Sequence, residues 1–361
     1  MKWQQLDPDD RHDWFPPDDA EAFGELVPLG SKVAKGSKGP ASCVLFKEYS
    51  LGISTNRDPV VYAFGSASLA EAVKHFAEHY SRELDRVRRK AVGKDQLDDF
   101  LDYSQVKWSR NLKRDLLLGT ELDFDPSKLR SAAYRPFCQR DLYFADTAVD
   151  ERGQFPRYFP TVTTSTENRV IAVTDKGSEK PFMAVIVSGI VDLHFVGAAS
   201  GTQCFPFYAY DEDGTNRREN VSDWALNQFR EHYKDKKIDK WAIFHYVYGL
   251  LHHPGYREKF ADNLKRELPR IPFAPDFRAF AEAGKKLAAL HLDYEQLEPW
   301  DLEFVEAPGV PLSYRVEDKM RLSKDKLRVT VNPSLTLARI PPAVLEYRLG
   351  NRSALEWVVD Q

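Results

Sequence analysis

The feature that most constrains the fold is a block of short β-rich runs between residues 134 and 210, which separates two sets of helical patterns. Clusters of Gly, Asp and Ser bound four such runs, at residues 169–174, 182–187, 191–196 and 204–210. Runs of this length with these boundaries predict a mostly antiparallel sheet. Because the helices stand before and after the strands, the pattern predicts an α+β fold. We expect helical segments flanking a central mostly antiparallel β-sheet, with a C-terminal helical unit and a terminal hairpin.

The longest helical pattern begins at Ser68, which stands three residues before Glu71, the spacing of a capping box. Apolar residues then recur at steps of three and four, namely Leu69, Val73, Phe76, Tyr80, Leu84 and Val87. Arg86, Arg88, Arg89 and Lys90 follow, and they suit the negative end of a helix dipole. A second helix is expected over residues 103–118.

Weaker patterns predict the remaining elements. The first 40 residues read as extended chain, and strands are expected at 43–46 and 60–64. After the β-rich block, helices are expected at 222–233, 240–252, 254–267 and 276–291, followed by a hairpin of residues 319–322 and 327–331. Ser353 and Glu356 again have capping-box spacing, which predicts a short terminal helix.

At 361 residues the chain exceeds one average domain, and these changes of pattern divide it into four parts. Residues 1–66 form an N-terminal linker and strand pair, and residues 67–130 a helical segment. Residues 131–215 form a β-rich subdomain. Residues 216–361 form a helical subdomain with a C-terminal hairpin and helix.

The charge of the chain is unevenly distributed. The net charge is −4, but residues 1–30 hold eight acidic and two basic residues, whereas residues 31–135 hold 19 Lys and Arg against 14 Asp and Glu. Binding of phosphate needs a local basic face rather than a basic protein. The distribution therefore permits nucleic-acid binding, although solvated helix faces give the same composition.

Catalytic motifs are missing from the sequence. It has no phosphate loop, no Gly-x-Ser-x-Gly, no Cys-x-x-Cys and no His-Glu-x-x-His. Asn332-Pro333 gives only the first half of the tetrapeptide with which amino-methyltransferases hold a flipped adenine. The triplets 235–237 and 317–319 match half of a magnesium nuclease site, but such matches arise easily in a charged chain. We expect no metal, no cofactor and no catalysis by this chain alone.

The three cysteines, Cys43, Cys138 and Cys204, are far apart and odd in number, which suits a reducing compartment. No signal peptide is visible, and the apolar runs are too short to cross a bilayer. The sequence therefore predicts a cytoplasmic protein without a membrane partner.

Four stretches together resemble the C-terminal target-recognition region of type ISP restriction–modification enzymes and related adenine-methyltransferase fusions. They are residues 52–64, the Tyr-Arg-Pro-Phe segment 134–144, residues 243–273, and residues 340–357 with Tyr347-Arg348 and Leu355-Glu-Trp357. Trp3, Pro8 and Trp14 resemble the run that follows the methyltransferase core. The resemblance implies that the chain recognises double-stranded DNA, with methyltransferase and translocase/nuclease modules as fused or separate partners.

The resemblance and the residue chemistry together nominate DNA-binding residues. In the β-rich segment, Arg135, Arg140, Arg152, Gln154 and Arg157 can reach base edges, because Arg pairs with guanine and Gln with adenine. The guanidinium of Arg135 is equally suited to gripping a phosphate. Asn56 and Arg57 in a turn, and Lys35 and Lys38 in a glycine-rich loop, can donate to phosphates.

Each of these residues also has a structural alternative. Arg135 can pair with an internal acid such as Asp141, and four acids (Asp141, Asp146, Asp150 and Glu151) can neutralise the neighbouring arginines. The lysine loop and the 52–58 turn can be ordinary surface segments. The function expected first is sequence-specific DNA binding. A non-catalytic assembly module comes second and a cryptic nuclease third.

Overall fold

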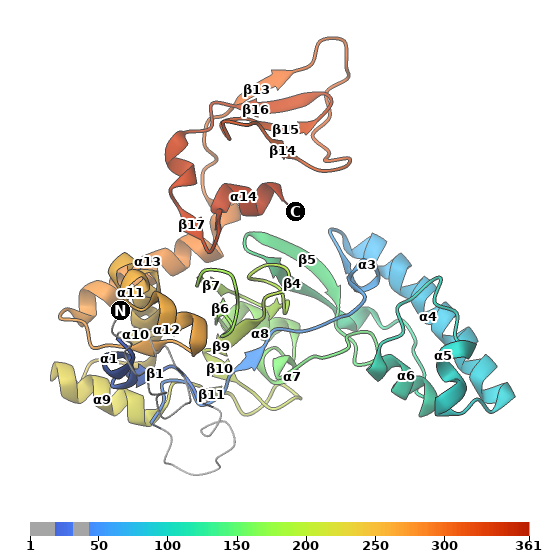
Figure 1. Ribbon diagram of the computed structural model, residues 1–361, viewed down its shortest axis with the longest axis horizontal. Helices are drawn as coiled ribbons and strands as arrows, with labels where there is room; N and C mark the ends of the chain where they lie inside the picture. The colour runs from blue at the N-terminus through green and yellow to red at the C-terminus, as the bar shows by residue number, and fades with distance from the viewer. Residues whose placement is uncertain (1–18, 32–42, 361) are drawn as a thin grey trace, which may run out of the picture.

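Two four-stranded sheets form the central β-rich part of the structure, a computed structural model that describes residues 19–31 and 43–360 (Figure 1). The first has the order β2, β9, β6, β7, with bounds Ser50–Leu51, Thr202–Pro206, Val170–Thr174 and Ala184–Val187. The second has the order β3, β5, β4, β8, with bounds Tyr62–Ala63, Cys138–Tyr143, Leu129–Arg135 and Ile190–Val191. Within the described ranges, every strand pair except β4–β8 is antiparallel. The predicted fold class is confirmed, but the single central sheet is wrong, because the β-rich block divides between two sheets.

The first sheet is buried on both faces. All five residues of β6 are buried. Val170 and Ala172 belong to one hydrophobic cluster, and Ile171 and Val173 belong to another. Since side chains alternate between the faces of a strand, the sheet separates two cores. We call the first cluster the arm-side core, because it also contains the second sheet and the helices between residues 66 and 117. We call the second the bundle-side core, because it contains the helices between residues 223 and 292.

The arm at the right of Figure 1 consists of α3 (Asp58–Val61), α4 (Ser66–Lys90), α5 (Leu97–Phe100) and α6 (Arg110–Leu117). The apolar face predicted for α4 is buried throughout. However, α4 begins two residues early, with Gly65 as its N-cap, and the hydroxyl of Ser68 donates to the carbonyl of Gly65 at 2.8 Å. The expected capping box at Ser68 is therefore wrong. Helix α6 is also shorter than predicted, because Ser109 caps its first turn by accepting from the amide of Leu112.

The N-terminal predictions are largely wrong within the described residues. Ala20–Gly24 form helix α1, and β1 (Val27–Pro28) pairs with β12 (Arg270–Ile271). In the expected strand 43–46, only Phe46 forms a bridge, to Val221. Residues 60 and 61 belong to α3, because Pro59 stands in its first turn, where proline is tolerated.

The helical bundle contains α9 (Asp223–Tyr233), α10 (Lys240–His252), α11 (Pro254–Lys259), α12 (Ala261–Arg266) and α13 (Phe277–Leu292). The four predicted helices are confirmed, except that 254–267 breaks into two at Phe260. Helices α10 and α13 approach closely at Gly249 and Gly284. A Cβ atom at Gly284 would lie 1.9 Å from the carbonyl oxygen of His245, so only glycine fits there.

The C-terminal unit stands above the rest of the molecule in Figure 1. Its sheet has the order β13, β16, β15, β14, with bounds Glu303–Glu306, Leu335–Ala338, Val329–Asn332 and Arg321–Leu322. The predicted hairpin is confirmed as β14–β15. The short pair β17 (Arg348–Leu349) and β18 (Arg352–Ser353) leads into α14 (Ala354–Val359), where the predicted capping box of Ser353 and Glu356 is present.

Helix α14 joins the C-terminal unit to the centre of the molecule. Val359 packs in the small core of the C-terminal unit, whereas Trp357 and the nearby Leu349 pack in the arm-side core. The indole N–H of Trp357 donates to the carbonyl of Leu349 at 3.0 Å. The two sides of one short helix therefore belong to different cores.

The remaining short elements are α7 (Phe155–Tyr158), α8 (Val162–Glu167), the pair β10 (Tyr208–Ala209) and β11 (Arg218–Glu219), and 3-10 turns at Lys94–Gln96, Pro126–Lys128, Tyr294–Gln296 and Pro342–Leu345. The predicted strand 191–196 is wrong after Val191, because the amide of His194 turns back to the side chain of Asp192. The described part of the chain has no helix that is both long and apolar enough to span a membrane.

The cores cut across the four parts expected from the sequence. Phe23 and Phe46, from the first part, lie in the bundle-side core, whereas Ile53 and Tyr62, from the same part, lie in the arm-side core. Domain boundaries at residues 66, 130 and 215 stay a prediction.

Candidate nucleic-acid interface

A pocket of about 300 Å³ lies between the β4–β5 hairpin, the loop before β7 and the end of the chain. Its charged and aromatic lining residues are Tyr134, Arg135, Arg140, Lys180, Arg352, Trp357 and Asp360. Four cations from four separate segments thus converge on one hollow, and only one carboxylate lines it. We call this hollow the cationic pocket.

Aromatic rings support three of the four cations. The guanidinium carbons of Arg135 and Arg140 both lie 4.0 Å from the centre of the Tyr134 ring. Both guanidinium groups therefore lie in van der Waals contact range of the same ring. Arg352 lies over Trp357 at 5.1 Å. Arg140 also lies 4.6 Å from the ring centre of Phe64, whose side chain is exposed. Cation–π contacts hold a charge in place without neutralising it.

The buried carboxylate of Asp192 also holds Arg135 in place. Its guanidinium donates to Asp192 at 2.7 Å, and Tyr62 donates to the other carboxylate oxygen at 3.3 Å. Burial raises the pKa of Asp192, while the charge of Arg135 acts in the opposite direction. The structural alternative of an internal ion pair therefore holds for Arg135, although its partner is Asp192 and not Asp141.

Two cations of the pocket have no ionic partner. Arg352 pairs with Asp360 at 2.5 Å, but Arg140 and Lys180 form no ion pair with any described residue. Burial lowers the pKa of Lys180, and the nearby charges of Arg352 and Arg135 lower it further. The Nε atom of Arg140 is buried and has no acceptor within the described part of the chain. The pocket consequently carries an excess of positive charge.

Gly197 makes room for Lys180. A Cβ atom at this position would lie 2.6 Å from Nζ of Lys180 and 3.4 Å from the ring of Trp357. The glycine has a φ of +117°, which side-chain-bearing residues rarely adopt. The backbone at Gly197 therefore lets the ammonium group reach the pocket.

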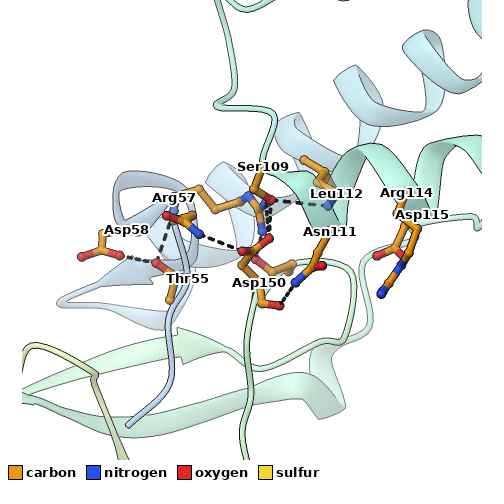
Figure 2. Close-up of polar contacts among 11 residues, drawn as sticks. Thr55, Arg57, Asp58, Ser109, Asn111, Leu112, Arg114, Asp115 and Asp150 are labelled. Carbon is orange, nitrogen blue, oxygen red and sulfur yellow. Dashed lines mark hydrogen bonds and ion pairs between the residues drawn. The ribbon is translucent and has the colours of Figure 1, made fainter. Parts of the chain in front are cut away.

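The 52–58 turn is clamped to the arm through Arg57, as Figure 2 shows. The guanidinium of Arg57 donates to the carbonyl of Ala148 at 2.5 Å and to Ser109 Oγ at 2.7 Å, and it lies 3.7 Å from Asp150. Ser109 in turn donates to Asp150. Only 1% of the side chain of Arg57 is exposed, and burial lowers its pKa. In this structure Arg57 holds the turn rather than a ligand.

Asn56 lies at the exposed tip of the same turn. Its φ is +57°, a left-handed conformation that Asn adopts more readily than most residues. Its amide donates to Asp150 at 2.8 Å, so Asp150 holds both Asn56 and Arg57. Asn56 is thus positioned by the clamp and still faces solvent.

The other predicted residues lie away from the cationic pocket. Gln154 lines a second hollow of about 600 Å³, together with Lys176 and Gln203. Arg157 pairs with Glu48 at 3.0 Å and donates to Gln154 at 3.2 Å, and Arg152 pairs with Asp146 at 2.7 Å. The expected neutralisation by neighbouring acids therefore holds for Arg152. Lys35 and Lys38 lie outside the described residues.

Sequence reasoning missed Lys180 and Arg352. Neither belongs to a local motif that marks a site, since Lys180 stands before a proline and Arg352 precedes a helix cap. Trp357 had a signal, because it belongs to the fourth resembling stretch. Only the folded chain brings these residues to Arg135 and Arg140.

Three segments that partly match catalytic motifs, at residues 235–237, 317–319 and 332–333, contain side chains that bind other parts of the chain. Asn332 is buried and donates to the carbonyls of Ser313 and Arg315, each at 2.8 Å. Asp235 pairs with Arg278, and Asp318 lies 3.4 Å from Arg321. The described residues hold no group of three His, Cys, Asp or Glu side chains suited to a metal.

Residues 44–361 match the family described as the Type ISP C-terminal specificity domain. Among solved structures, the chain is similar to the cryoEM structure of a DrdV–DNA complex, with a TM-score of 0.87 and 34% identity over 100% of this chain and 35% of that chain. The chain is also similar to a nuclease-deletion mutant of the Type ISP restriction–modification enzyme LlaGI in complex with a DNA substrate mimic. The TM-score is 0.82 and the sequence identity is 28%, over 100% of this chain and 27% of that chain.

The ATP-dependent Type ISP restriction–modification enzyme LlaBIII bound to DNA gives a TM-score of 0.81 and 25% identity, over 99% of this chain and 22% of that chain. The chain thus spans about a third or less of the length of these structures. No curated protein sequence matches it.

Proposed function

The chain belongs to the Type ISP C-terminal specificity domain family, and from this premise we propose that it recognises a specific sequence in double-stranded DNA as the target-recognition part of a bacterial restriction–modification enzyme. The methyltransferase, translocase and nuclease activities would belong to partner modules, fused or separate. The similar structures are DNA complexes, which supports the proposal.

The single observation that carries the proposal is the cationic pocket. It holds two cations, Arg140 and Lys180, that have no ionic partner among the described residues, on a chain whose net charge is negative. A negatively charged protein that concentrates unpaired cations in one hollow is suited to a local anionic ligand, and DNA has a charged group at every step.

The proposal gives different tasks to the nominated residues. Arg152, Gln154 and Arg157 are proposed to reach base edges. Asn56, for which the sequence suggested a phosphate contact, is also proposed to reach a base edge, because it is exposed at the tip of its turn. Lys35 and Lys38 are proposed to contact phosphates. Arg57 is proposed to act indirectly, by holding the turn that carries Asn56.

Salt dependence of DNA binding tests the proposal directly. The logarithm of the affinity for duplex DNA should fall steeply with the logarithm of the salt concentration, by about 0.9 for each phosphate contact. Fluorescence anisotropy should give a shallower slope for the double variant Arg140→Ala/Lys180→Ala than for the unchanged chain. Lys236→Ala is the control, because Lys236 is exposed and lies in the loop after α9. A flat salt dependence of the unchanged chain would contradict the proposal.

Selection from a randomised duplex library tests base reading. Replacing Gln154 by Ala should relax the preference at one base pair by about 1–3 kcal/mol, since one bidentate contact discriminates by that amount. An unchanged preference for Gln154→Ala, Asn56→Ala and Arg157→Ala would place the reading surface elsewhere.

A second candidate function, a non-catalytic assembly module, has one observation in its favour. The C-terminal unit exposes Trp300, Phe304 and Tyr314, with exposed fractions of 69%, 56% and 68%. Exposed aromatic side chains near one another suit a protein partner. Salt-insensitive binding to a methyltransferase without any DNA binding would favour this candidate, and magnesium-dependent cleavage by the chain alone would favour a nuclease.

A further inference from the structure

We propose that the cationic pocket is a phosphate site, which grips one phosphodiester of the DNA backbone and does not read a base. This inference rests on the proposed function and deepens it. It also replaces the expectation that Arg135 and Arg140 reach base edges.

The walls of the pocket are unsuited to a stacked base. The ring of Tyr134 already packs against two guanidinium groups, each 4.0 Å from its centre, and Arg352 lies over Trp357. Trp357 is also 98% buried, since only 2% of it is exposed. Because cations already pack on Tyr134 and Trp357 is buried, neither ring offers the open stacking platform that an extruded or single-stranded base uses.

The charge of the pocket is unsuited to a base edge. A base edge is neutral, so its binding would leave the charges of Arg140 and Lys180 uncompensated. A phosphodiester carries a full negative charge and accepts several hydrogen bonds at once. It would neutralise the charge of Arg140, which lines the pocket and forms no ion pair with any described residue. Its charge would also relieve the repulsion that Arg352 and Arg135 exert on Lys180.

The size of the pocket agrees with this ligand. A water molecule occupies about 30 Å³ in the liquid, so the volume of about 300 Å³ holds a phosphate group and several waters. Such waters bridge the phosphate to side chains that do not touch it directly. The backbone can therefore enter the pocket without displacing a protein element.

The pocket also depends on the docked C-terminal unit. Arg135 and Arg140 come from β4 and β5, Lys180 from the loop between β6 and β7, and Arg352 from β18. A phosphate held by all four would therefore connect the second sheet to the end of the chain. Its grip would fix the C-terminal unit in register with the rest of the interface.

The first experiment measures duplex affinity and base preference of the full chain. Arg140→Ala and Lys180→Ala should each weaken binding roughly tenfold, which corresponds to about 1.4 kcal/mol. The loss should be equal for every duplex sequence, and each variant should flatten the salt slope by about one unit. Lys236→Ala should change neither quantity, and thermal unfolding should show that all variants fold. A changed base preference for either pocket variant would overturn the inference while the proposed function stands.

The second experiment identifies the phosphate. Duplexes that carry one neutral methylphosphonate at successive positions are bound to the unchanged chain and to Lys180→Ala. One position should weaken the unchanged chain more than it weakens Lys180→Ala, because that variant has already lost one of the contacts to the phosphate. Equal sensitivity of both proteins at every position would overturn the inference.

The third experiment separates the site from the function. Inorganic phosphate, added at constant ionic strength to the isotope-labelled chain, should shift the NMR signal of the Arg140 side chain, which Arg140→Lys assigns. A shift in a chain that binds no duplex would support the phosphate chemistry and overturn both its assignment to DNA and the proposed function. No shift, in a chain that binds duplex, would overturn the phosphate site alone.

Discussion

Gly197 is the residue on which the reach of Lys180 depends. Replacing it by Ala places a Cβ atom against Lys180 Nζ and imposes an unfavourable φ of +117°. We expect Gly197→Ala to displace the ammonium group and to weaken duplex binding about as much as Lys180→Ala does. The double variant should bind no worse than either single variant, because both remove the same contact.

Gly177 provides the matched control for this prediction. It also has a positive φ, of +75°, but a Cβ atom there would have no neighbour within 4 Å. Gly177→Ala should therefore share the backbone strain, which costs about 1–3 kcal/mol, without the loss of DNA binding. Urea unfolding measures the first effect and anisotropy the second. Equal loss of affinity in both variants would show that strain, and not Lys180, is responsible.

Arg57, unlike Lys180, is expected to affect the stability of the fold and not the contact with DNA. Arg57→Ala would leave the carbonyl of Ala148 without its buried donor and Asp150 without its ionic partner. Breaking a buried ion pair by removing one partner costs about 3–5 kcal/mol, and we expect denaturant unfolding to show a loss of that size. Arg114→Ala, which removes the exposed pair with Asp115, should cost about 1 kcal/mol or less. Similar losses for both variants would refute the clamp.

Among the elements, α14 has the clearest dependence on pH. Glu356 accepts from Lys326 at 2.5 Å and from the amide of Ser353, and these contacts lower its pKa to about 2. Because the pKa of Glu356 is lower in the folded state, its charge stabilises the fold at pH values above about 4.5, the pKa of Glu in the unfolded chain. This contribution is lost as the pH falls towards 2. Glu356→Gln keeps the shape of the capping box but lacks the charge.

Thermal unfolding at a series of pH values measures this contribution. The unchanged chain should be more stable than Glu356→Gln at neutral pH, and the difference should shrink between about pH 4.5 and about pH 2. Glu346→Gln, which removes an exposed carboxylate of the same unit, is the control. A difference that persists below pH 2 would show that packing, and not the charge, stabilises α14.

The elements that the sequence predicted correctly are those whose signals are local. The apolar face of α4, the helices of the bundle, the β14–β15 hairpin and the Ser353–Glu356 capping box each depend on neighbours within a few residues. Helix starts were misplaced by a few residues, and other errors occurred where a distant partner determines the structure. The 43–46 segment gives its amides to residues 28 and 29, and Arg135 finds Asp192, 57 positions away. The same limit applies to the site, since only the folded chain brings Lys180 and Arg352 next to Arg135 and Arg140.

At the scale of the whole molecule, a chain of hydrogen bonds connects the first sheet to the C-terminal unit. The amide of Ile186 donates to the hydroxyl of Tyr248 at 3.0 Å, and Tyr248 bonds to Nδ1 of His291. Burial lowers the pKa of His291 to about 4, so the ring is neutral at pH 7 and carries its proton on Nε2 when Tyr248 donates to Nδ1. Nε2 lies 2.6 Å from the hydroxyl of Tyr347, the residue that precedes β17.

Removing the last hydroxyl of this chain should loosen the docking of the C-terminal unit. Tyr347→Phe loses one hydrogen bond, worth about 1 kcal/mol, so the docked population should fall relative to the undocked one by about fivefold. Hydrogen exchange at residues 348–359 should accelerate, and duplex affinity should fall with the docked fraction. Tyr314→Phe, an exposed tyrosine of the same unit, is the control. Faster exchange throughout the molecule would contradict a local effect.

The first sheet, buried on both faces, also determines how such a molecule can diversify. Transplanting the β-rich segment alone from a relative is one route to a new target specificity, but β6 contributes alternate residues to both cores. The transplanted segment would therefore pack foreign side chains against the host's arm on one face and against the host's bundle helices on the other. Viable chimaeras should therefore exchange the arm, both central sheets and the bundle as one cassette. Successful recombination between natural relatives should leave its crossover points outside that block.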